Sequence, residues 1–271
     1  MTTIRELFAS PLPRIEVEIL LAHALELKRI DLYTKYEQTI PSHHLSIFQS
    51  LLQRRLQHEP IAYITGYQPF MSLDFEVNQL VLIPRPETEK LVEVVIDTIK
   101  ESKVRCPMSN VADVGTGSGC IAVSLAKYLP EIKVTGIDSS PESIKIAQRN
   151  AQKHGVEDRC QFLTGDMFEP LSSKPDLIIS NPPYISTADI ETLEPNVRDW
   201  EPKQALDGGQ DGLDYIRRLI EEGPKYSNCL IFEFGINQAE KIKELAKDKF
   251  KNVKIIRDHA EKERIFSGSN T

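Results

Sequence analysis

The spacing of hydrophobic positions changes along the chain and divides it into regions. In residues 1–72, apolar side chains recur three or four positions apart, which is the spacing of one helix face. After residue 85, short apolar runs alternate with helical stretches, the first of them expected over 87–99. Seven of the short runs predict strands, near residues 111–114, 133–138, 161–164, 176–180, 229–234, 253–257 and 264–267. This alternation is typical of a doubly wound, mostly parallel α/β sheet.

A β-hairpin is expected to join the helical region to the α/β region. Residues 73–77 alternate apolar and polar side chains, Asn78 and Gln79 are suited to a turn, and residues 80–83 form a second apolar run. The chain is therefore predicted to have three parts: a small all-helical domain (1–72), a β-hairpin linker (73–84) and an α/β domain (85–271).

Composition and charge narrow the class of protein. The 271 residues carry a net charge of −7, and no apolar run reaches the length that crosses a membrane. The four cysteines are dispersed without a C-x-x-C pair, so neither disulfides nor a metal site is expected. The N-terminus lacks a signal sequence, so we expect a cytoplasmic protein. We also expect the protein to work as a monomer. Residues 73–271 hold 26 Lys/Arg against 33 Asp/Glu, which disfavours direct binding to nucleic acid.

Asn181-Pro182-Pro183-Tyr184 is the most informative motif, because it directly follows a buried apolar run. In an open α/β sheet, ligands bind where such strands end. The two prolines have no N–H group, so the loop offers carbonyl acceptors in a fixed backbone conformation. With the side-chain oxygen of Asn181, these carbonyls would grip a planar –NH2 group, and Tyr184 would supply a flat face beside it. The alternative interpretation is a plain turn after the strand.

A second motif, Asp113-Val114-Gly115-Thr116-Gly117-Ser118-Gly119, follows a predicted strand and opens a helix. Its glycines let the backbone approach a ligand closely. The spacing differs from the dinucleotide fingerprint, and no Lys-Ser or Lys-Thr pair follows as in a P-loop. The next strand ends in Asp138, nineteen residues after Gly119, where a carboxylate can accept both hydroxyls of a ribose. The alternative role of Asp138 is the N-cap of the following helix.

Together these motifs resemble those of an S-adenosylmethionine-dependent amino-methyltransferase. Further segments are similar to HemK-type protein-(glutamine-N5) methyltransferases, which modify bacterial peptide chain release factors. These segments are Glu59-Pro60-Ile61-Ala62-Tyr63-Ile64-Thr65-Gly66, Leu82-Ile83-Pro84-Arg85-Pro86-Glu87-Thr88-Glu89, Trp200-Glu201-Pro202, Ala205-Leu206-Asp207-Gly208-Gly209, Arg257-Asp258 and Arg264. The resemblance implies a seven-stranded, Rossmann-like class I methyltransferase sheet, with residues 1–72 as a substrate-recognition domain.

The resemblance also implies roles for the site residues. The cofactor, S-adenosylmethionine, would contact Gly115, Thr116, Gly117, Ser118, Gly119, Asp138, Asp166, Met167 and Asn181. The substrate would bind at Asn181, Pro182, Pro183 and Tyr184, of which Asn181, Pro182 and Tyr184 would be catalytic. Arg85 and Glu87 have two open interpretations: they orient the domain interface or the cofactor's amino acid end, or they form a structural salt bridge at the linker.

The reaction that the resemblance implies is methylation of the side-chain amide of the Gly-Gly-Gln glutamine in release factors. The nearest alternative is a sister enzyme that methylates a ribosomal protein and tends to have Arg-Ser-Pro where this chain has Arg85-Pro86-Glu87-Thr88. A DNA N6-adenine methyltransferase and a non-catalytic binding module are further alternatives. The chain's own Gly208-Gly209-Gln210 is interpreted as a flexible turn. It lies in a long stretch, 185–213, whose irregular pattern is typical of a functional lid.

Overall fold

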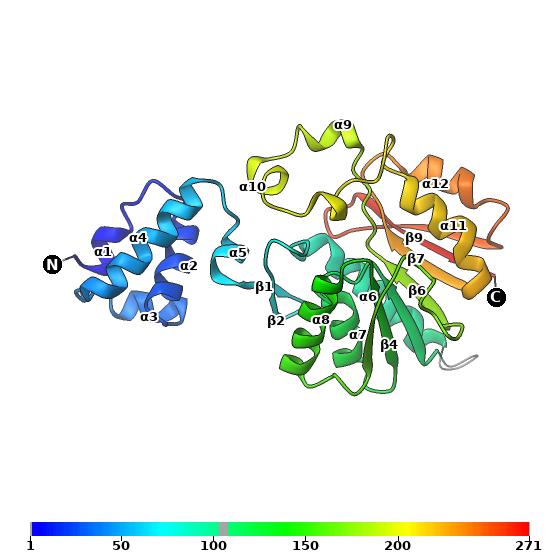
Figure 1. Ribbon diagram of the computed structural model, residues 1–271, viewed down its shortest axis with the longest axis horizontal. Helices are drawn as coiled ribbons and strands as arrows, with labels where there is room; N and C mark the ends of the chain where they lie inside the picture. Colours follow the sequence, from blue (N-terminus) through cyan, green and yellow to red (C-terminus); the bar gives the residue numbers. More distant parts are fainter. Residues whose placement is uncertain (1, 103–107, 271) are drawn as a thin grey trace. The chain divides into compact units, whose positions relative to one another are not determined.

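The chain, followed through the computed structural model in Figure 1, is described over residues 2–102 and 108–270. It divides into two compact units. The helical unit comprises Met1–Tyr67 and Glu194–Trp200, and the sheet unit comprises Gln68–Leu193 and Glu201–Thr271. The first division therefore falls at residue 67 rather than 72, and a segment from far along the sequence joins the helical unit.

Prolines and a capping box set where helices of the helical unit begin. Pro13 directly precedes α2 (Arg14–Ala24), Pro41 precedes α4 (Ser42–Leu56), and Thr3 caps α1 (Ile4–Leu7). The other helices of this unit are α3 (Arg29–Thr34), α5 (Ile61–Thr65) and α10 (Pro195–Arg198). The apolar faces of α1 to α5 enclose a common core whose fully buried members include Val17, Leu20, Leu21 and Leu32.

The sheet unit is built on seven strands in the order β5-β4-β3-β6-β7-β9-β8. They are β3 (Asn110–Val114), β4 (Lys133–Asp138), β5 (Cys160–Thr164), β6 (Leu177–Ser180), β7 (Cys229–Glu233), β8 (Asn252–Arg257) and β9 (Glu263–Ser269). Neighbours from β5 to β7 pair in parallel, while β9 is antiparallel to both β7 and β8. The predicted doubly wound α/β fold and all seven predicted strands are confirmed.

Helices cover both faces of this sheet (Figure 1). One face carries α6 (Pro86–Ser102), α7 (Cys120–Tyr128) and α8 (Pro141–His154), and the other carries α11 (Asp214–Tyr226) and α12 (Ala239–Ala246). Side chains alternate between the two cores, so Leu177 and Ile179 face one and Ile178 faces the other. Because both faces are covered, the central strands β6 and β7 are buried at every position, which makes their apolar runs conspicuous in the sequence.

The predicted hairpin of 73–77 with 80–83 is wrong: the strand at 73–76 forms, but it pairs with a segment upstream of it. The observed pair is β1 (Tyr67–Phe70) with β2 (Leu73–Glu76), and the turn is made by Met71 and Ser72, both with positive φ. The expected return strand at 80–83 does not form. At Asn78 the side-chain oxygen accepts the Leu80 N–H at 2.9 Å, which turns the chain away from the hairpin.

The stretch 185–213 is also less irregular than expected. It contains α9 (Thr187–Ile190), α10 and a short 3₁₀ helix, η1 (Lys203–Ala205). Among the residues that the structure describes, no helix is long and apolar enough to cross a membrane.

The strand order reverses between β3 and β6. Val114 at the end of β3 pairs with Ser180 at the end of β6. The loops that begin at Gly115 and Asn181 are therefore neighbours at the carboxyl edge of the sheet, and a Cβ built on Gly115 would lie 4.0 Å from the Asn181 carbonyl oxygen. Such a reversal is where open α/β sheets bind ligands.

Candidate active site

A cavity of about 990 Å³ opens at this reversal point. Eight predicted site residues line it: Gly115, Gly117, Asp138, Asp166, Met167, Asn181, Pro182 and Pro183. Residues 79–82, which belong to the linker region, form another part of its wall. The other four predicted site residues, Thr116, Ser118, Gly119 and Tyr184, are not among the described residues that line the cavity, so they lie behind its wall.

The glycine loop presents backbone to the cavity. Gly115 and Gly117 have φ values of 76° and 53°, in the left-handed region that favours glycine. A Cβ built on Gly117 would meet no atom within 4 Å, so the main chain faces open space there. Thr116 points inward and donates to Asp113 Oδ2 at 2.6 Å. At Gly119 a Cβ would lie 2.9 Å from the Ala147 Cβ, so this glycine allows α8 to pack closely.

Asp138 holds the glycine loop from the tip of β4. Its Oδ2 accepts the Gly117 N–H and its Oδ1 accepts the Ser140 N–H, each at 2.9 Å. The N-cap of α8 is Ser140, whose hydroxyl accepts the Ser143 N–H, so the N-cap interpretation of Asp138 is wrong. Burial raises the pKa of Asp138. Each carboxylate oxygen accepts one of these bonds and has capacity for another, and Asp138 lines the cavity.

Three segments far apart in the sequence meet behind Asn181. Its side-chain Nδ2 donates to Thr88 Oγ1 at 3.1 Å, and Thr88 Oγ1 donates to Glu233 Oε2 at 2.7 Å. The Tyr184 hydroxyl donates to the other Glu233 oxygen at 3.0 Å. Burial raises the pKa of both Tyr184 and Glu233. The Asn181 amide thus has its nitrogen turned toward the protein interior, which leaves its oxygen for the cavity.

Thr88 and Glu233 are functional candidates that the sequence interpretation missed. Thr88 stood in the quoted linker segment, but Glu87 was singled out instead; Glu87 is exposed and does not line the cavity. Glu233 carries a recognisable signal, since an acid ends the apolar run of β7 beside β6. Nothing in the sequence indicates that these two side chains meet.

The contacts of Arg85 agree with the second interpretation given above, a structural salt bridge at the linker. It forms an ion pair with Glu201, whose other oxygen accepts the Ile83 N–H at 3.2 Å. The Glu201 side chain is only 1% exposed, so the pair fastens the start of α6 to the segment that carries Glu201.

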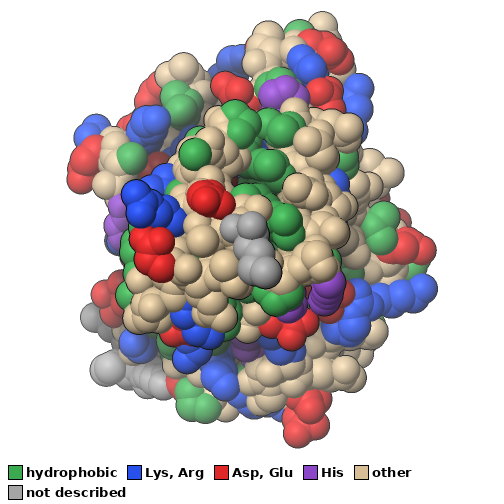
Figure 2. Space-filling model, turned by 90° about the vertical axis from the view of Figure 1, so that its left-hand side faces the viewer, with side chains coloured by type: hydrophobic (Ala, Val, Ile, Leu, Met, Phe, Trp, Pro, Cys, Tyr) green, Lys and Arg blue, Asp and Glu red, His purple; other side chains and the backbone are tan. Residues whose placement is uncertain are grey.

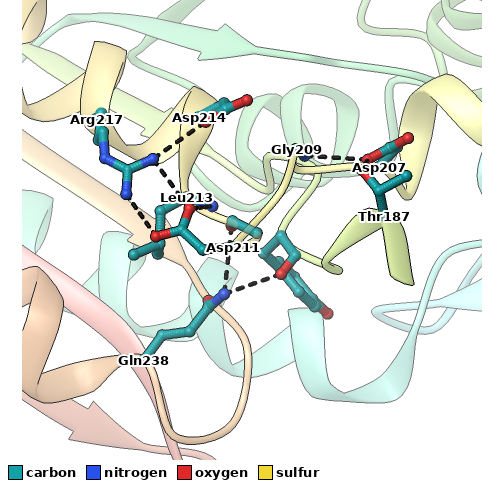
Figure 3. Close-up of polar contacts among 10 residues, drawn as sticks. Thr187, Asp207, Gly209, Asp211, Leu213, Asp214, Arg217 and Gln238 are labelled. Atoms are coloured by element: carbon teal, nitrogen blue, oxygen red, sulfur yellow. Dashed lines mark hydrogen bonds and ion pairs between the residues drawn. The ribbon is translucent and has the colours of Figure 1, made fainter. Parts of the chain in front are cut away.

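The main chain after Tyr184 is held by Gln238 (Figure 3). The Gln238 Nε2 donates to the Tyr184 carbonyl at 2.9 Å and to the Gly212 carbonyl at 3.2 Å, while its Oε1 accepts the Gly235 N–H at 2.7 Å. One amide side chain therefore joins three loops at the active-site edge. A Cβ on Gly212 would lie 2.4 Å from the Tyr184 carbonyl oxygen, so only glycine fits there.

Gly208-Gly209-Gln210 lies in a closely bonded loop rather than in a flexible turn. The Thr187 hydroxyl and the Gly209 N–H both donate to Asp207 Oδ1, at 2.7 and 3.0 Å. Figure 3 shows Arg217 bridging Asp211 and Asp214 farther along the same loop. These contacts fix the loop as one wall of the cavity, to which Asp207, Gly209 and Asp214 contribute.

Asp166 and Met167 form a further part of the cavity wall. Both oxygens of Asp166 accept from Arg218 of α11, at 3.0 and 2.9 Å, an arginine that the sequence interpretation did not include. Met167 is 7% exposed and belongs to the core under α11. This part of the wall therefore combines a fixed carboxylate with an apolar side chain.

The doubly wound seven-stranded sheet, with a glycine loop after β3 and an acid at the tip of β4, defines a class I methyltransferase. Residues 90–194 match the family described as Methyltransferase small domain. The fold is shared with the hMettl16 catalytic domain (TM-score 0.59, 15% identity, 74% of this chain and 77% of that chain). It is also shared with the ribosomal protein L11 methylase of Lactobacillus delbrueckii subsp. bulgaricus (TM-score 0.50, 19% identity, 76% and 90%).

The particular family follows from the whole chain. Residues 3–66 match the family described as PrmC N-terminal domain. The release factor glutamine methyltransferase of Geobacter sulfurreducens is 47% identical over 84% of this chain and 79% of its own length. That of Moorella thermoacetica is 40% identical over 94% and 90%. The chain belongs to the release factor glutamine methyltransferase family.

Proposed function

We propose that this chain transfers a methyl group from S-adenosylmethionine to the side-chain amide nitrogen (N5) of the glutamine in the Gly-Gly-Gln motif of peptide chain release factors. The observation that carries the proposal is that Asn181 and Pro182 both line the cavity at the reversal point, with the Asn181 amide nitrogen bonded to Thr88. The Asn181 side-chain oxygen and the Pro182 carbonyl would then form an acceptor pair. Two oxygens match the two N–H groups of a primary amide. Membership of the family supports the same substrate.

Three features of the cavity support the proposal that it binds S-adenosylmethionine. The open backbone at Gly117 admits the close approach of the methionine end. The Asp138 oxygens keep lone pairs for the two ribose hydroxyls. Asp166, fixed by Arg218, and the apolar Met167 would flank the adenine. Thr116, Ser118 and Gly119 act indirectly in this arrangement, by shaping the loop. When bound, S-adenosylmethionine supplies a methyl group activated by its positive sulfur.

The protein's part in the reaction is to position and polarise a weak nucleophile. The lone pair of an amide nitrogen is delocalised into its carbonyl. Asn181 Oδ1 and the Pro182 carbonyl would accept both amide hydrogens and thereby favour the positive charge that develops on the nitrogen. Positioning of this kind contributes an effective molarity of about 10⁵–10⁸ M. Tyr184 holds the loop through its hydrogen bond to Glu233. Because its pKa is raised, the Tyr184 hydroxyl stays protonated and does not act as a general base.

The helical unit is proposed to select the release factor. Its exposed large hydrophobic side chains are Ile15, Ile30, Tyr33, Ile47, Leu56 and Tyr67. Figure 2 shows hydrophobic side chains interspersed with charged ones on the face turned toward the viewer. A mixed surface of this kind suits a protein partner better than nucleic acid. The enzyme is proposed to act as a monomer in the cytoplasm.

Transfer of tritium from labelled S-adenosylmethionine tests the substrate class. The labelled cofactor is incubated separately with purified release factor, ribosomal proteins and DNA, with and without protease. The expected result is label in the release factor alone, and none in a release factor whose Gly-Gly-Gln glutamine is replaced. Protease-resistant label in DNA, or preferential label in a ribosomal protein, would overturn the assignment.

A further inference from the structure

The carboxyl group of Glu233 is the end point of a hydrogen-bond chain that reaches the acceptor pair. Glu233 ends β7 and is 1% exposed. The parallel register pairs Ser180 with Phe232, so the next residues, Asn181 and Glu233, are neighbours at the sheet edge. Its two oxygens accept from the Thr88 and Tyr184 hydroxyls, at 2.7 and 3.0 Å.

The direction of each hydrogen bond follows from counting protons. When Glu233 is ionised its oxygens can only accept, so Thr88 and Tyr184 both donate to it. A threonine hydroxyl has one proton, and Thr88 has committed it to Glu233. The contact between Thr88 and Asn181, at 3.1 Å, therefore requires the Asn181 amide nitrogen as donor. Amide flips are assigned from such networks, and this network permits one orientation.

We propose that Glu233 is a positioning residue that acts through Thr88 to hold the Asn181 amide with its oxygen toward the substrate. Through the Tyr184 hydroxyl it holds the aromatic ring of the same loop. This inference rests on the proposed function, because an acceptor in the cavity matters only for a substrate that donates an N–H. The reverse orientation would present –NH2 to –NH2 and abolish the acceptor pair.

The charges around Glu233 determine whether it stays ionised, and therefore whether Thr88 continues to donate to it. Burial raises its pKa, and the negative charge of Glu87 on α6 acts the same way. The two hydroxyl donors and the positive charge of Arg264 on β9 lower it. When Glu233 gains a proton, one oxygen becomes a donor and Thr88 is free to turn its own proton toward Asn181. Turnover should therefore fall on the acid side as Glu233 becomes protonated.

Substitutions at Thr88 test the chain with little change of volume. Thr88→Val removes the hydroxyl and keeps the branched shape, whereas Thr88→Ser keeps the hydroxyl. Removing a hydrogen bond to a charged group typically costs a factor of about 10 to 100, so kcat of Thr88→Val should fall by that much. The KM for release factor and the affinity for S-adenosylmethionine should change little. Thr88→Ser should restore most of the lost kcat.

The pH profile separates positioning from structural support. In the wild type and in Thr88→Ser, kcat should fall at low pH as Glu233 becomes protonated. This acid limb of the pH profile should be absent in Thr88→Val and in Glu233→Gln. Wild-type kcat in Thr88→Val, or equal losses in Thr88→Ser and Thr88→Val, would overturn the inference. If Thr88→Val does not fold, an unchanged acid limb in Glu233→Gln would overturn it instead. Failure of the wild-type enzyme to methylate release factor would count against the proposed function and not against this inference alone.

Discussion

Replacing Asn181 removes one half of the acceptor pair. Asn181→Ala also removes the donor to Thr88, but Thr88 keeps its 2.7 Å bond to Glu233, so the interior behind the loop should survive. One amide hydrogen of the substrate then has no partner while positive charge develops on the nitrogen. The loss of a group matched to developing charge typically costs about 2.7–4 kcal/mol, so turnover should fall about 10²–10³-fold.

Asn181→Asp keeps the shape and an oxygen but changes the pattern of donors. The single proton of Thr88 cannot serve both Glu233 and a second carboxylate, so one buried oxygen loses its donor at a cost of about 1–3 kcal/mol. Once protonated, the new carboxyl would donate to Thr88 and accept from the substrate, as the amide does. Its activity should therefore be low at neutral pH and rise as the pH falls, opposite to wild type.

The assay is initial-rate methylation of saturating release factor. Circular dichroism and calorimetric titration with S-adenosylmethionine serve as controls for folding and cofactor binding. If both variants fold, bind the cofactor and methylate at near wild-type rates at neutral pH, the acceptor-pair reasoning is refuted.

Three other changes test separate features of the structure. Gly212→Ala should lower the urea midpoint and the methylation rate together, because its Cβ would meet the Tyr184 carbonyl oxygen. Gly155 also has a positive φ, but a Cβ there would meet nothing within 4 Å, so Gly155→Ala should cost only about 1–2 kcal/mol of stability and no activity. Burial raises the pKa of Asp113 from 3.8 to about 7, so the unfolded chain releases this proton first, and stability should fall as pH rises from about 4 to 7. Asp113→Asn should remove this dependence of the unfolding free energy on pH. An unchanged pH dependence in urea titrations of the variant would contradict the prediction. Removing residues 1–66, which leaves β1 and β2 intact, should preserve cofactor binding while release factor methylation drops sharply; full-speed methylation would exclude the proposed role of the helical unit.

The central strands β6 and β7 were the easiest to predict, because every residue in them is buried. Runs such as Leu177-Ile178-Ile179 show no alternation and stand between polar loops. The hairpin was harder to predict. The apolar run at 80–83 has the composition of a strand, but part of it lines the cavity, and Met71-Ser72 is not a common turn sequence.

Some site residues could also be predicted from the sequence, whereas others could not. Asn181, Gly117 and Asp138 lie within motifs whose spacing fixes their place at the sheet edge. The partners of these residues come from distant segments: Thr88 is 93 residues from Asn181, and Arg218 is 52 residues from Asp166. Such pairings depend on how the helices pack against the sheet, which no local pattern encodes.

Mass spectrometry of release factor after incubation with this enzyme and S-adenosylmethionine tests the central claim most directly. The account predicts one added methyl group on the tryptic peptide that bears Gly-Gly-Gln, and fragment ions that place it on the glutamine side-chain amide. The Asn181→Ala enzyme should yield almost none. An unmodified peptide with an active wild-type enzyme, or a methyl group on any other residue, would contradict the account.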